Sequence, residues 1–450
     1  MDYKKLTASY KDEMLKTLKE FVAINSEYDE ASVDKDNPFG KGVSKALNYI
    51  ADVARKDGFE VTNYNNMVVE ILAGKGEKNI TIMAHADVVP AGSGWGQDPF
   101  EVVNKDGVLF GRGVADDKGP LLSCYYGLKA LKDNNLLGHY TVRFLVGGNE
   151  ESGSRGIEYY FNTLKKPQPN LGFSPDSAYP LTYGEKGMYN YEVKSKFDVK
   201  GLISLKGGVA FNAVIEQAEA YLVNDENVKT ALLKYNEIEV NDLGDVLKVT
   251  CLGKAAHGSL PWEGVNAGIK LVTILGEVFD CKEFKHFTKL YTDTRGKGIN
   301  AYYENEEMGT NSLCIGVIKY ENGEFYFTVN FRYINNIDVE KMIKDINKIN
   351  KPFEVNVTST SKLLYYPVDS DLVSTLLRVY QEETGDYVTK PLTSGGGTYA
   401  KETDNVIAFG CEYPGWDAHM HSPDESIKVD HLVESMAILA KAIIELGKKL

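Results

Sequence analysis

Several short segments of the chain carry residues of the types that bind divalent metal ions, and most of them directly follow an apolar run typical of a β-strand. These residues are His85 and Asp87, Asp116 and Asp117, Glu150 and Glu151, Asp176, and His421. Two imidazoles and three or more carboxylates exceed the needs of one four-coordinate zinc ion, but they suit two divalent ions that share a bridging carboxylate. The first hypothesis is therefore a paired metal site.

The spacing of His85 and Asp87 suits a metal ligand and the group that orients it. One imidazole nitrogen can bind the metal while the carboxylate accepts the N–H of the other, which fixes the tautomer of the ring. We therefore predict that His85 is the ligand and that Asp87 orients it. A lone His-x-Asp pair is more often structural, so this interpretation depends on the other segments.

Two pairs of adjacent acidic residues complete the candidate site, and each pair has an alternative interpretation. Of Glu150 and Glu151, one carboxylate can bind metal while its neighbour deprotonates a water molecule. The alternative is a solvated acidic loop after Gly147-Gly148. Asp116 and Asp117 could instead cap the following helix, because acidic residues stabilise a helix N-terminus.

The elements around these residues predict an α/β domain with a mainly parallel sheet. Helices expected at 11–24 and 43–57 alternate with strands near Asn66 and Ile80, and this alternation is typical of βαβ architecture. In such a sheet, functional groups gather beyond the carboxyl ends of the strands. Asn104–Gly107 predicts a hairpin, and Pro120 suits the start of a helix at 121–132.

From about Gly184 the pattern changes to that of an α+β domain. Strands are expected at 189–194 and 324–332, with helices near 213–222 and 267–279. In the strand 324–332, apolar and polar residues alternate, so Arg332 is expected on the face opposite the core.

After Pro367 the α/β pattern returns, with a helix near 372–383, a strand at 406–409 and a long final helix. Because His421 lies in this last part, the first domain must be discontinuous. We predict a metal-binding domain of residues 1–184 and 367–450 and an inserted domain of residues 185–366.

Composition limits the classes of partner. At 450 residues the chain is long enough for two cores. A formal net charge of −14 argues against nucleic acid and anionic membrane surfaces as partners. No stretch of about 18 apolar residues and no signal-peptide core is seen, which predicts a cytoplasmic protein. Five scattered cysteines without CxxC spacing favour buried free thiols over a disulfide framework or a thiolate zinc site.

An ordered set of motifs resembles one known family over essentially the whole chain. The motifs are His85–Pro90, Gly111–Pro120, Asn149–Ser152, Ser174–Asp176 and His421–Glu425. They are similar to the co-catalytic metallopeptidases that include acetylornithine deacetylase, succinyl-diaminopimelate desuccinylase, carnosinase and the bacterial peptidase V-type dipeptidases. The likeness is closest to the peptidase V type, which also matches Gly92–Trp95, Asp98–Phe100 and Gly395–Tyr399.

The resemblance implies a role for each candidate residue of the metal site. One ion takes His85 and Asp176, the other takes Glu151 and His421, and Asp116 bridges them. Glu150 becomes the general base, with Asp87 beside it in the catalytic set as the group that orients His85. The family's Asp-x-Lys-Gly pattern selects Asp116 over Asp117, and its His-x-x-x-Glu pattern selects His421 over the competing His419.

The inserted domain resembles the family's lid, and it implies a second set of residues. His257 matches the histidine that polarises the scissile carbonyl, Asn212 matches a position that grips a substrate oxygen, and Arg332 matches the group that holds the C-terminal carboxylate. The backbone cradle for that carboxylate corresponds to Gly395, Gly396, Gly397 and Thr398. Alternatively, Asn212 caps a helix, Arg332 is a surface residue and the glycine run is an ordinary loop.

The resemblance implies a metallo-exopeptidase that hydrolyses unblocked dipeptides through a hydroxide bridging two divalent ions. Zinc is the expected metal, with manganese or cobalt as alternatives, because histidine and carboxylate ligands accept all three. An N-acyl amino-acid deacylase with the same chemistry is the alternative enzyme, although Asp176 favours the dipeptidase because the family's deacylases tend to carry Glu there. A catalytically silent peptide-binding protein is the alternative of another class. The expected partner is a small peptide, and the expected state is a monomer.

Overall fold

Nine strands from the first and last parts of the chain form one mixed sheet. Their order is β1-β2-β6-β3-β7-β22-β9-β20, and β21 pairs with β9. The strands are β1 (Glu60–Tyr64), β2 (Val68–Gly74), β3 (Asn79–His85), β6 (Thr141–Gly147), β7 (Leu171–Ser174), β9 (Thr182–Glu185), β20 (Leu364–Tyr365), β21 (Leu392–Ser394) and β22 (Val406–Ala408). The four central strands β6, β3, β7 and β22 are parallel. This confirms the predicted α/β class with a mainly parallel sheet.

The structure, a computed structural model, describes residues 1–450, and the chain divides into two compact units. The first unit comprises Met1–Gly184, Leu364–Thr393 and Gly397–Leu450; the second comprises Glu185–Leu363 and Ser394–Gly396. The chain therefore leaves the first unit after β9 and returns to it at β20. None of the helices is long and apolar enough to cross a membrane.

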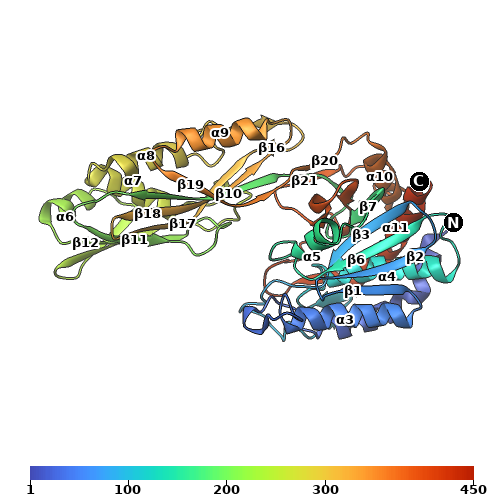
Figure 1. The fold of residues 1–450 in the computed structure, drawn as a ribbon. Coiled ribbons are helices and arrows are strands. Elements are labelled where there is room, and N and C mark those ends of the chain that lie inside the picture. The colour runs from blue at the N-terminus through green and yellow to red at the C-terminus, as the bar shows by residue number, and fades with distance from the viewer. The chain divides into compact units, whose positions relative to one another are not determined.

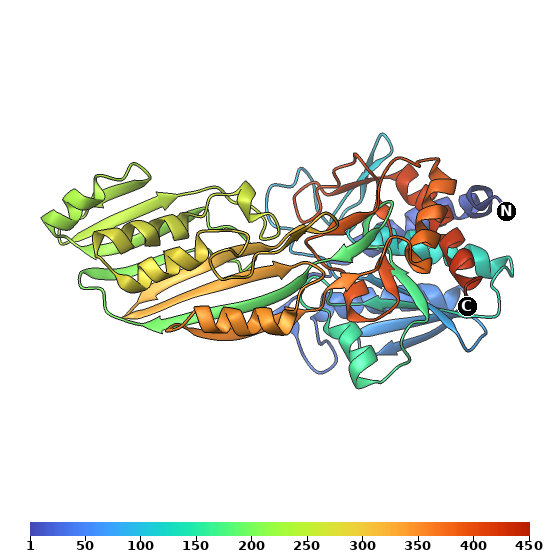
Figure 2. The ribbon, with the colours of Figure 1, turned by 90° about the horizontal axis from the view of Figure 1, so that it is seen from above.

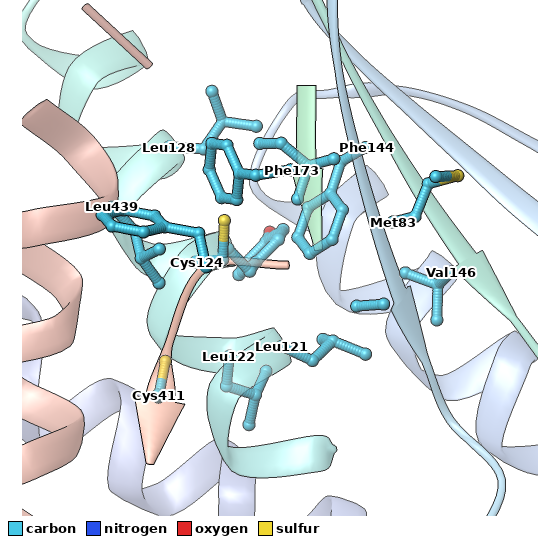
Figure 3. Packing of buried hydrophobic residues seen from close by; sticks show 14 of the residues in the cluster. Met83, Leu121, Leu122, Cys124, Leu128, Phe144, Val146, Phe173, Cys411 and Leu439 are labelled. Atoms are coloured by element: carbon cyan, nitrogen blue, oxygen red, sulfur yellow. The ribbon is translucent and has the colours of Figure 1, made fainter. Parts of the chain in front are cut away.

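The helices of the first unit are α1 (Tyr3–Thr7), α2 (Lys11–Val22), α3 (Lys41–Lys56), α4 (Lys118–Asp133), α5 (Arg155–Glu158), α10 (Asp371–Thr384) and α11 (Val429–Gly447). Of these, α4 and α11 pack against the central strand β3, α3 packs against β1 and β2, and α1 and α10 pack against other helices. Leu121, Leu122 and Leu128 of α4 gather with Phe144 and Phe173 of the sheet in a fully buried cluster (Figure 3). Burying large apolar side chains in this way is the main source of stability for the unit.

Small two- and three-stranded ribbons carry the loops of the first unit. They are formed by β4 (Val103–Lys105), β5 (Val108–Phe110) and β24 (Ser426–Lys428), and by β8 (Ser177–Ala178) with β23 (Cys411–Glu412). The hairpin predicted at Asn104–Gly107 is present, and Asp106 and Gly107 have φ of 52° and 84°. The helix predicted at 121–132 begins earlier, at Lys118, so Pro120 lies inside its first turn, where a missing N–H breaks no helical hydrogen bond.

The second unit is built on an antiparallel sheet of eight strands in the order β13-β14-β12-β11-β17-β18-β10-β19. The strands are β10 (Gly187–Lys196), β11 (Leu202–Gly207), β12 (Gln217–Val223), β13 (Ile238–Asp242), β14 (Val246–Leu252), β17 (Ser312–Glu321), β18 (Glu324–Tyr333) and β19 (Glu354–Ser361), with a separate ribbon of β15 (Glu304–Asn305) and β16 (Gly309–Thr310). The helices are α6 (Glu226–Leu232), α7 (Ala267–Val278), α8 (Lys282–Tyr291) and α9 (Val339–Ile349). These helices lie along one face of the sheet (Figures 1 and 2).

Alternation along the strands separates a core face from a helix-free face in this sheet. Phe325 and Phe327 of β18 join Phe284 and Phe287 of α8 in an aromatic cluster, with the Phe287 and Phe327 ring centroids 4.8 Å apart. Arg332 lies on the helix-free face, as the alternation predicts. It is nevertheless buried, so the alternative of an exposed surface arginine is wrong.

The helix predicted near 213–222 is wrong. Residues Gln217–Val223 form strand β12, which pairs with β11 and β14. Ala218, Ala220 and Leu222 are buried in strict alternation, which is the two-residue period of a strand and not the period of a helix. Two alanines in a short segment raise helix propensity, but pairing on both sides overrides that local preference. All five cysteines are free and buried, as expected.

Candidate metal centre

The candidate ligands gather at the carboxyl end of the parallel strands of the first unit. His85 is the last residue of β3 and pairs in register with Gly147, the last residue of β6. This register brings the segment with Glu150 and Glu151 next to His85. Asp176 follows β7, the other parallel neighbour of β3. The sheet topology therefore explains why ligands from distant parts of the sequence meet.

Asp116 stands at the centre of this cluster and contacts a histidine on each side. Its Oδ1 lies 3.0 Å from Nε2 of His85, and its Oδ2 lies 2.9 Å from Nε2 of His421. Asp176 Oδ2 lies 3.5 Å from the same nitrogen of His85. Glu151 Oε2 lies 3.3 Å from the same nitrogen of His421.

These contacts define two overlapping groups that could each hold a metal ion. The first is His85, Asp116 and Asp176; the second is Asp116, Glu151 and His421; and within each group the ligand atoms lie within 4.8 Å of one another. Asp116 is the member that the groups share. Glu150, Asp117 and His419 belong to neither group.

The electrostatics of the cluster fit divalent cations. Burial, then the charge of Asp116, raises the pKa of Asp176, and the same two causes raise the pKa of Glu151 to about 7. Hydrogen bonds to Asp116 and Glu151 raise the pKa of His421 to about 11. In addition, Oε1 of Glu151 is buried without a partner. Crowded, buried carboxylates of this kind are stabilised by a cation, and the set of nitrogen and oxygen donors suits zinc, manganese or cobalt.

Asp87 contacts both His85 and the backbone of the two glutamates. The Asp87 backbone oxygen lies 3.0 Å from Nδ1 of His85, and its Oδ1 lies 3.4 Å from the same nitrogen. Its two carboxylate oxygens also accept the backbone N–H groups of Glu150 and Glu151, each at 3.1 Å. Asp87 thus fixes the position of His85 relative to Glu150 and Glu151. The sequence indicates only the contact with His85.

The glycines before the acidic pair pack closely instead of forming a solvated loop. Gly147 and Gly148 are both buried. A Cβ on Gly148 would lie 2.7 Å from a methyl carbon of Val43, and one on Gly147 would overlap the ring of Tyr399. That ring stands edge-on to His85, with centroids 6.2 Å apart. The absence of side chains therefore lets the strand end approach its neighbours closely.

Burial dominates the environment of Glu150. Burial, then the charge of Asp176, raises the pKa of the Glu150 carboxyl well above its usual value. For His85, burial alone would lower the pKa, but hydrogen bonds to Asp116 and Asp176 raise it well above its usual value. Glu150 is half-buried and lies next to a ligand group without belonging to it. This is the placement expected of a proton carrier.

Asp117 has a supporting contact that differs from helix capping. It is the N-cap residue of α4, but its side chain makes no capping hydrogen bond. Instead, Oδ2 accepts the backbone N–H of His85 at 3.0 Å, while Oδ1 is buried without a partner. His419 is directed elsewhere, with its Nε2 3.7 Å from Asp417.

Glu425 joins the two loops that carry Asp116 and His421, a role that the sequence does not reveal. Its carboxylate binds Arg112 Nη1 at 2.6 Å and accepts the backbone N–H groups of Gly113, Ala115 and Asp116 at 2.8–3.1 Å. Both Arg112 and Glu425 are fully buried. A carboxylate that accepts several N–H groups fixes the loop around it. The only signal in the sequence is that both charged residues lie inside motifs.

The second unit holds Asn212, Arg332 and His257. Asn212 and Arg332 line a pocket of about 270 Å³ on its sheet. The carbonyl of Asn212 accepts the N–H of Gly258 at 2.7 Å, so Asn212 lies beside the segment that carries His257. His257 Nδ1 lies 2.7 Å from Ser259 Oγ. Asn212 precedes no helix, so the capping alternative is wrong.

The segment Gly395–Thr398 divides between the units. The carbonyl of Gly395 accepts Arg332 Nη1 at 2.6 Å in the second unit, where Gly396 N also donates to Ser394 Oγ at 2.9 Å. In the first unit, Thr398 Oγ1 accepts the backbone N–H of Ala400 at 3.2 Å and caps a short helical turn at Tyr399–Glu402. Specific hydrogen bonds thus hold Gly395, Gly396 and Thr398, although the segment itself is neither helix nor strand.

A model of the family described as Peptidase family M20/M25/M40 matches residues 81–445. The chain belongs to this family. A Staphylococcus aureus (strain MRSA252) protein, provisionally named a dipeptidase, is 34% identical over 468 residues, or 99% of both chains. The beta-Ala-Xaa dipeptidase of Lactobacillus delbrueckii subsp. lactis is 33% identical over 473 residues, covering 100% of this chain and 99% of that protein.

A solved structure shows the same fold at lower sequence identity. The crystal structure of human carnosine dipeptidase 1 covers 99% of this chain and 98% of its own, with a TM-score of 0.61 and 18% identity. The resemblance expected from the motifs is therefore confirmed as membership of the M20 family, with the arrangement of a mainly parallel sheet and an inserted antiparallel sheet.

Proposed function

We propose that this M20-family protein is a metal-dependent dipeptidase that hydrolyses unblocked dipeptides. The observation that carries the proposal is the pair of ligand groups that share Asp116, with the half-buried Glu150 beside them. The names of the full-length relatives, a provisional dipeptidase and a beta-Ala-Xaa dipeptidase, support the same substrate class.

In this proposal His85 and Asp176 hold one divalent ion, Glu151 and His421 hold the other, and Asp116 serves both. When bound, the two ions would lower the pKa of water and polarise the scissile carbonyl. Zinc is the proposed metal. In each group the ligand atoms lie within 4.8 Å of one another, so the protein contributes a preformed arrangement of donors.

The chain's own residues move the proton and select the substrate. Glu150 takes a proton from the attacking water and delivers it to the leaving amine, while Asp87 holds the backbone of Glu150 in place. His257 donates to the oxygen that becomes negative in the transition state. Inserted residues 185–366 supply substrate recognition, with Arg332 and Gly395–Thr398 directed to the C-terminal carboxylate and Asn212 to a substrate oxygen.

The proposal extends to the state of the protein in solution. We propose a monomer in the cytoplasm whose partner is a small peptide. The excess of acidic residues, which gives a formal net charge of −14, is consistent with a partner that is neither nucleic acid nor an anionic membrane.

The test compares four related substrates with the metal-loaded enzyme. An unblocked dipeptide should be cut much faster than its C-terminal amide, its N-acetyl form or a tetrapeptide with the same residues, because Arg332 requires a carboxylate close to the scissile bond. Faster cleavage of an N-acetyl amino acid would instead identify a deacylase. No turnover of any substrate with any divalent metal would identify a silent binding protein.

A further inference from the structure

Arg332 is a buried cation that has no carboxylate partner. Its Nε donates to Asn330 Oδ1 at 2.9 Å, and its Nη1 donates to the carbonyl of Gly395 at 2.6 Å. The residue is only 4% exposed, and burial lowers the pKa of its guanidinium to about 10. Both of these acceptors are neutral amide oxygens, so the positive charge stays available to an anion that enters the pocket.

Asn330 is held by a chain of polar side chains on the helix-free face of the sheet. Its Nδ2 donates to Asn190 Oδ1 at 2.6 Å, and Asn190 Nδ2 donates to Ser359 Oγ at 3.0 Å. Because the guanidinium can only donate, Asn330 must present its oxygen to Arg332 and its amide nitrogen to Asn190. Hydrogen-bond donation therefore runs in one direction along these residues, from Arg332 through Asn330 and Asn190 to Ser359.

The same oxygen of Asn330 also borders the segment next to His257. A Cβ on Gly258 would lie 2.9 Å from Asn330 Oδ1 and 2.8 Å from the carbonyl of Asn212. Only glycine leaves room for this approach. Asn330 is 2% exposed. Its side-chain oxygen therefore lies, buried, between Arg332 and the segment that carries Asn212 and His257.

We propose that Asn330 is a positioning residue that fixes the Arg332 guanidinium and thereby gives the enzyme its preference for a free C-terminal carboxylate. This inference rests on the proposed function. An amide suits the role because it orients the cation without neutralising it. An aspartate of nearly the same shape would form a buried ion pair with Arg332 and compete with the substrate carboxylate.

The test measures kcat and KM for an unblocked dipeptide and for its C-terminal amide in matched variants. Asn330→Asp should lower the ratio of the two kcat/KM values by about tenfold or more, mainly through a higher KM for the dipeptide. Hydrolysis of the amide should stay near the wild-type rate, which shows that the fold is intact. Asn330→Ala removes the acceptor without adding charge and should lower the same ratio, so the test does not depend on whether the aspartate variant folds.

Thr328→Val is the control, because Thr328 lies two residues earlier on the same face and its hydroxyl accepts the Val317 N–H at 3.0 Å without contacting Arg332. This variant should keep the wild-type ratio. If Arg332→Ala lowers the ratio but both Asn330 variants leave it unchanged, Asn330 does not position the arginine and the inference is overturned. If the wild-type enzyme does not distinguish the dipeptide from its amide, the role proposed for Arg332 fails together with this inference.

Discussion

Asp116 is the residue on which both ligand groups depend. Each of its carboxylate oxygens lies about 3 Å from a different histidine. Asp116→Ala should therefore remove metal from both groups and abolish activity. Asp117→Asn should retain most of the metal, because Asp117 supports the backbone of His85 and belongs to neither group. Elemental analysis of the two purified variants checks the ranking, and the reverse order would show that the wrong aspartate has been assigned.

Glu150 and Glu151 are adjacent in sequence but should have different functions. If Glu150 carries the proton, Glu150→Gln should reduce kcat by at least about a hundredfold while the metal content persists. Glu151→Gln is the matched control and should lose metal, since Glu151 is a member of the second group. Metal loss in the Glu150 variant would refute its assignment as the base.

At this scale, the sequence predicts which residues form the cluster but not what supports them. Ligand types, their positions after strands and the motif set identify His85, Asp116, Glu151, Asp176 and His421. The contact between Arg112 and Glu425 joins residues 313 positions apart, and their places inside two motifs do not show that they form a pair. The bond between Asn330 and Arg332 depends on the choice of rotamers on one strand face, which alternation alone does not determine.

At the scale of elements, the loop after β5 and the loop before β24 form one assembly through Glu425. The carbonyl of Glu425 also accepts the N–H of Gly111 at 3.1 Å, next to the pairing of Ser426 with Phe110. The antiparallel pairing of β24 with β5 thus continues as far as Glu425, whose side chain holds the loop that carries Asp116. This explains how His421 and Asp116 reach the same place although 305 residues separate them.

Glu425→Gln should destabilise the protein and weaken metal binding together. Removing the charge leaves the buried Arg112 without its anion, and breaking a buried ion pair costs about 3–5 kcal/mol in unfolding free energy. Urea unfolding of the metal-free protein measures this loss, and metal titration measures the affinity. Asp52→Asn, which breaks an exposed pair with Arg55, should change neither quantity. Normal stability in the Glu425 variant would mean that the pair does not hold the loops.

Among the helices, the sequence predicts correctly those with a long, regular hydrophobic period. The expected helices at 43–57 and 267–279 correspond to α3 and α7 within two residues at each end. The prediction of a helix at 213–222 is wrong because, over a short segment, an alanine-rich strand and an alanine-rich helix have similar sequences. Burial between two neighbouring strands, which is a tertiary property, decides the outcome there.

At the scale of the whole molecule, the first unit depends on both ends of the chain. Helix α11 packs against α4, and Leu432, Met436, Leu439 and Ile443 are completely buried. Each such side chain contributes about 1.5–3 kcal/mol, so the four together contribute about 6–12 kcal/mol, which is comparable with the typical stability of about 5–15 kcal/mol. A chain truncated after Lys428 should therefore lose metal binding and cooperative unfolding even though it keeps every candidate ligand. Retention of both would show that α11 is dispensable.

The central claim is that a paired metal site in this chain hydrolyses dipeptides. The most direct measurement is a stepwise titration of the metal-free enzyme with zinc, manganese or cobalt, in which bound metal per chain and hydrolysis of an unblocked dipeptide are followed in the same samples. We predict that two ions bind per chain and that turnover rises with their binding, and that Asp116→Ala abolishes both. Binding without turnover for every metal, or full turnover in the metal-free protein, would contradict the claim.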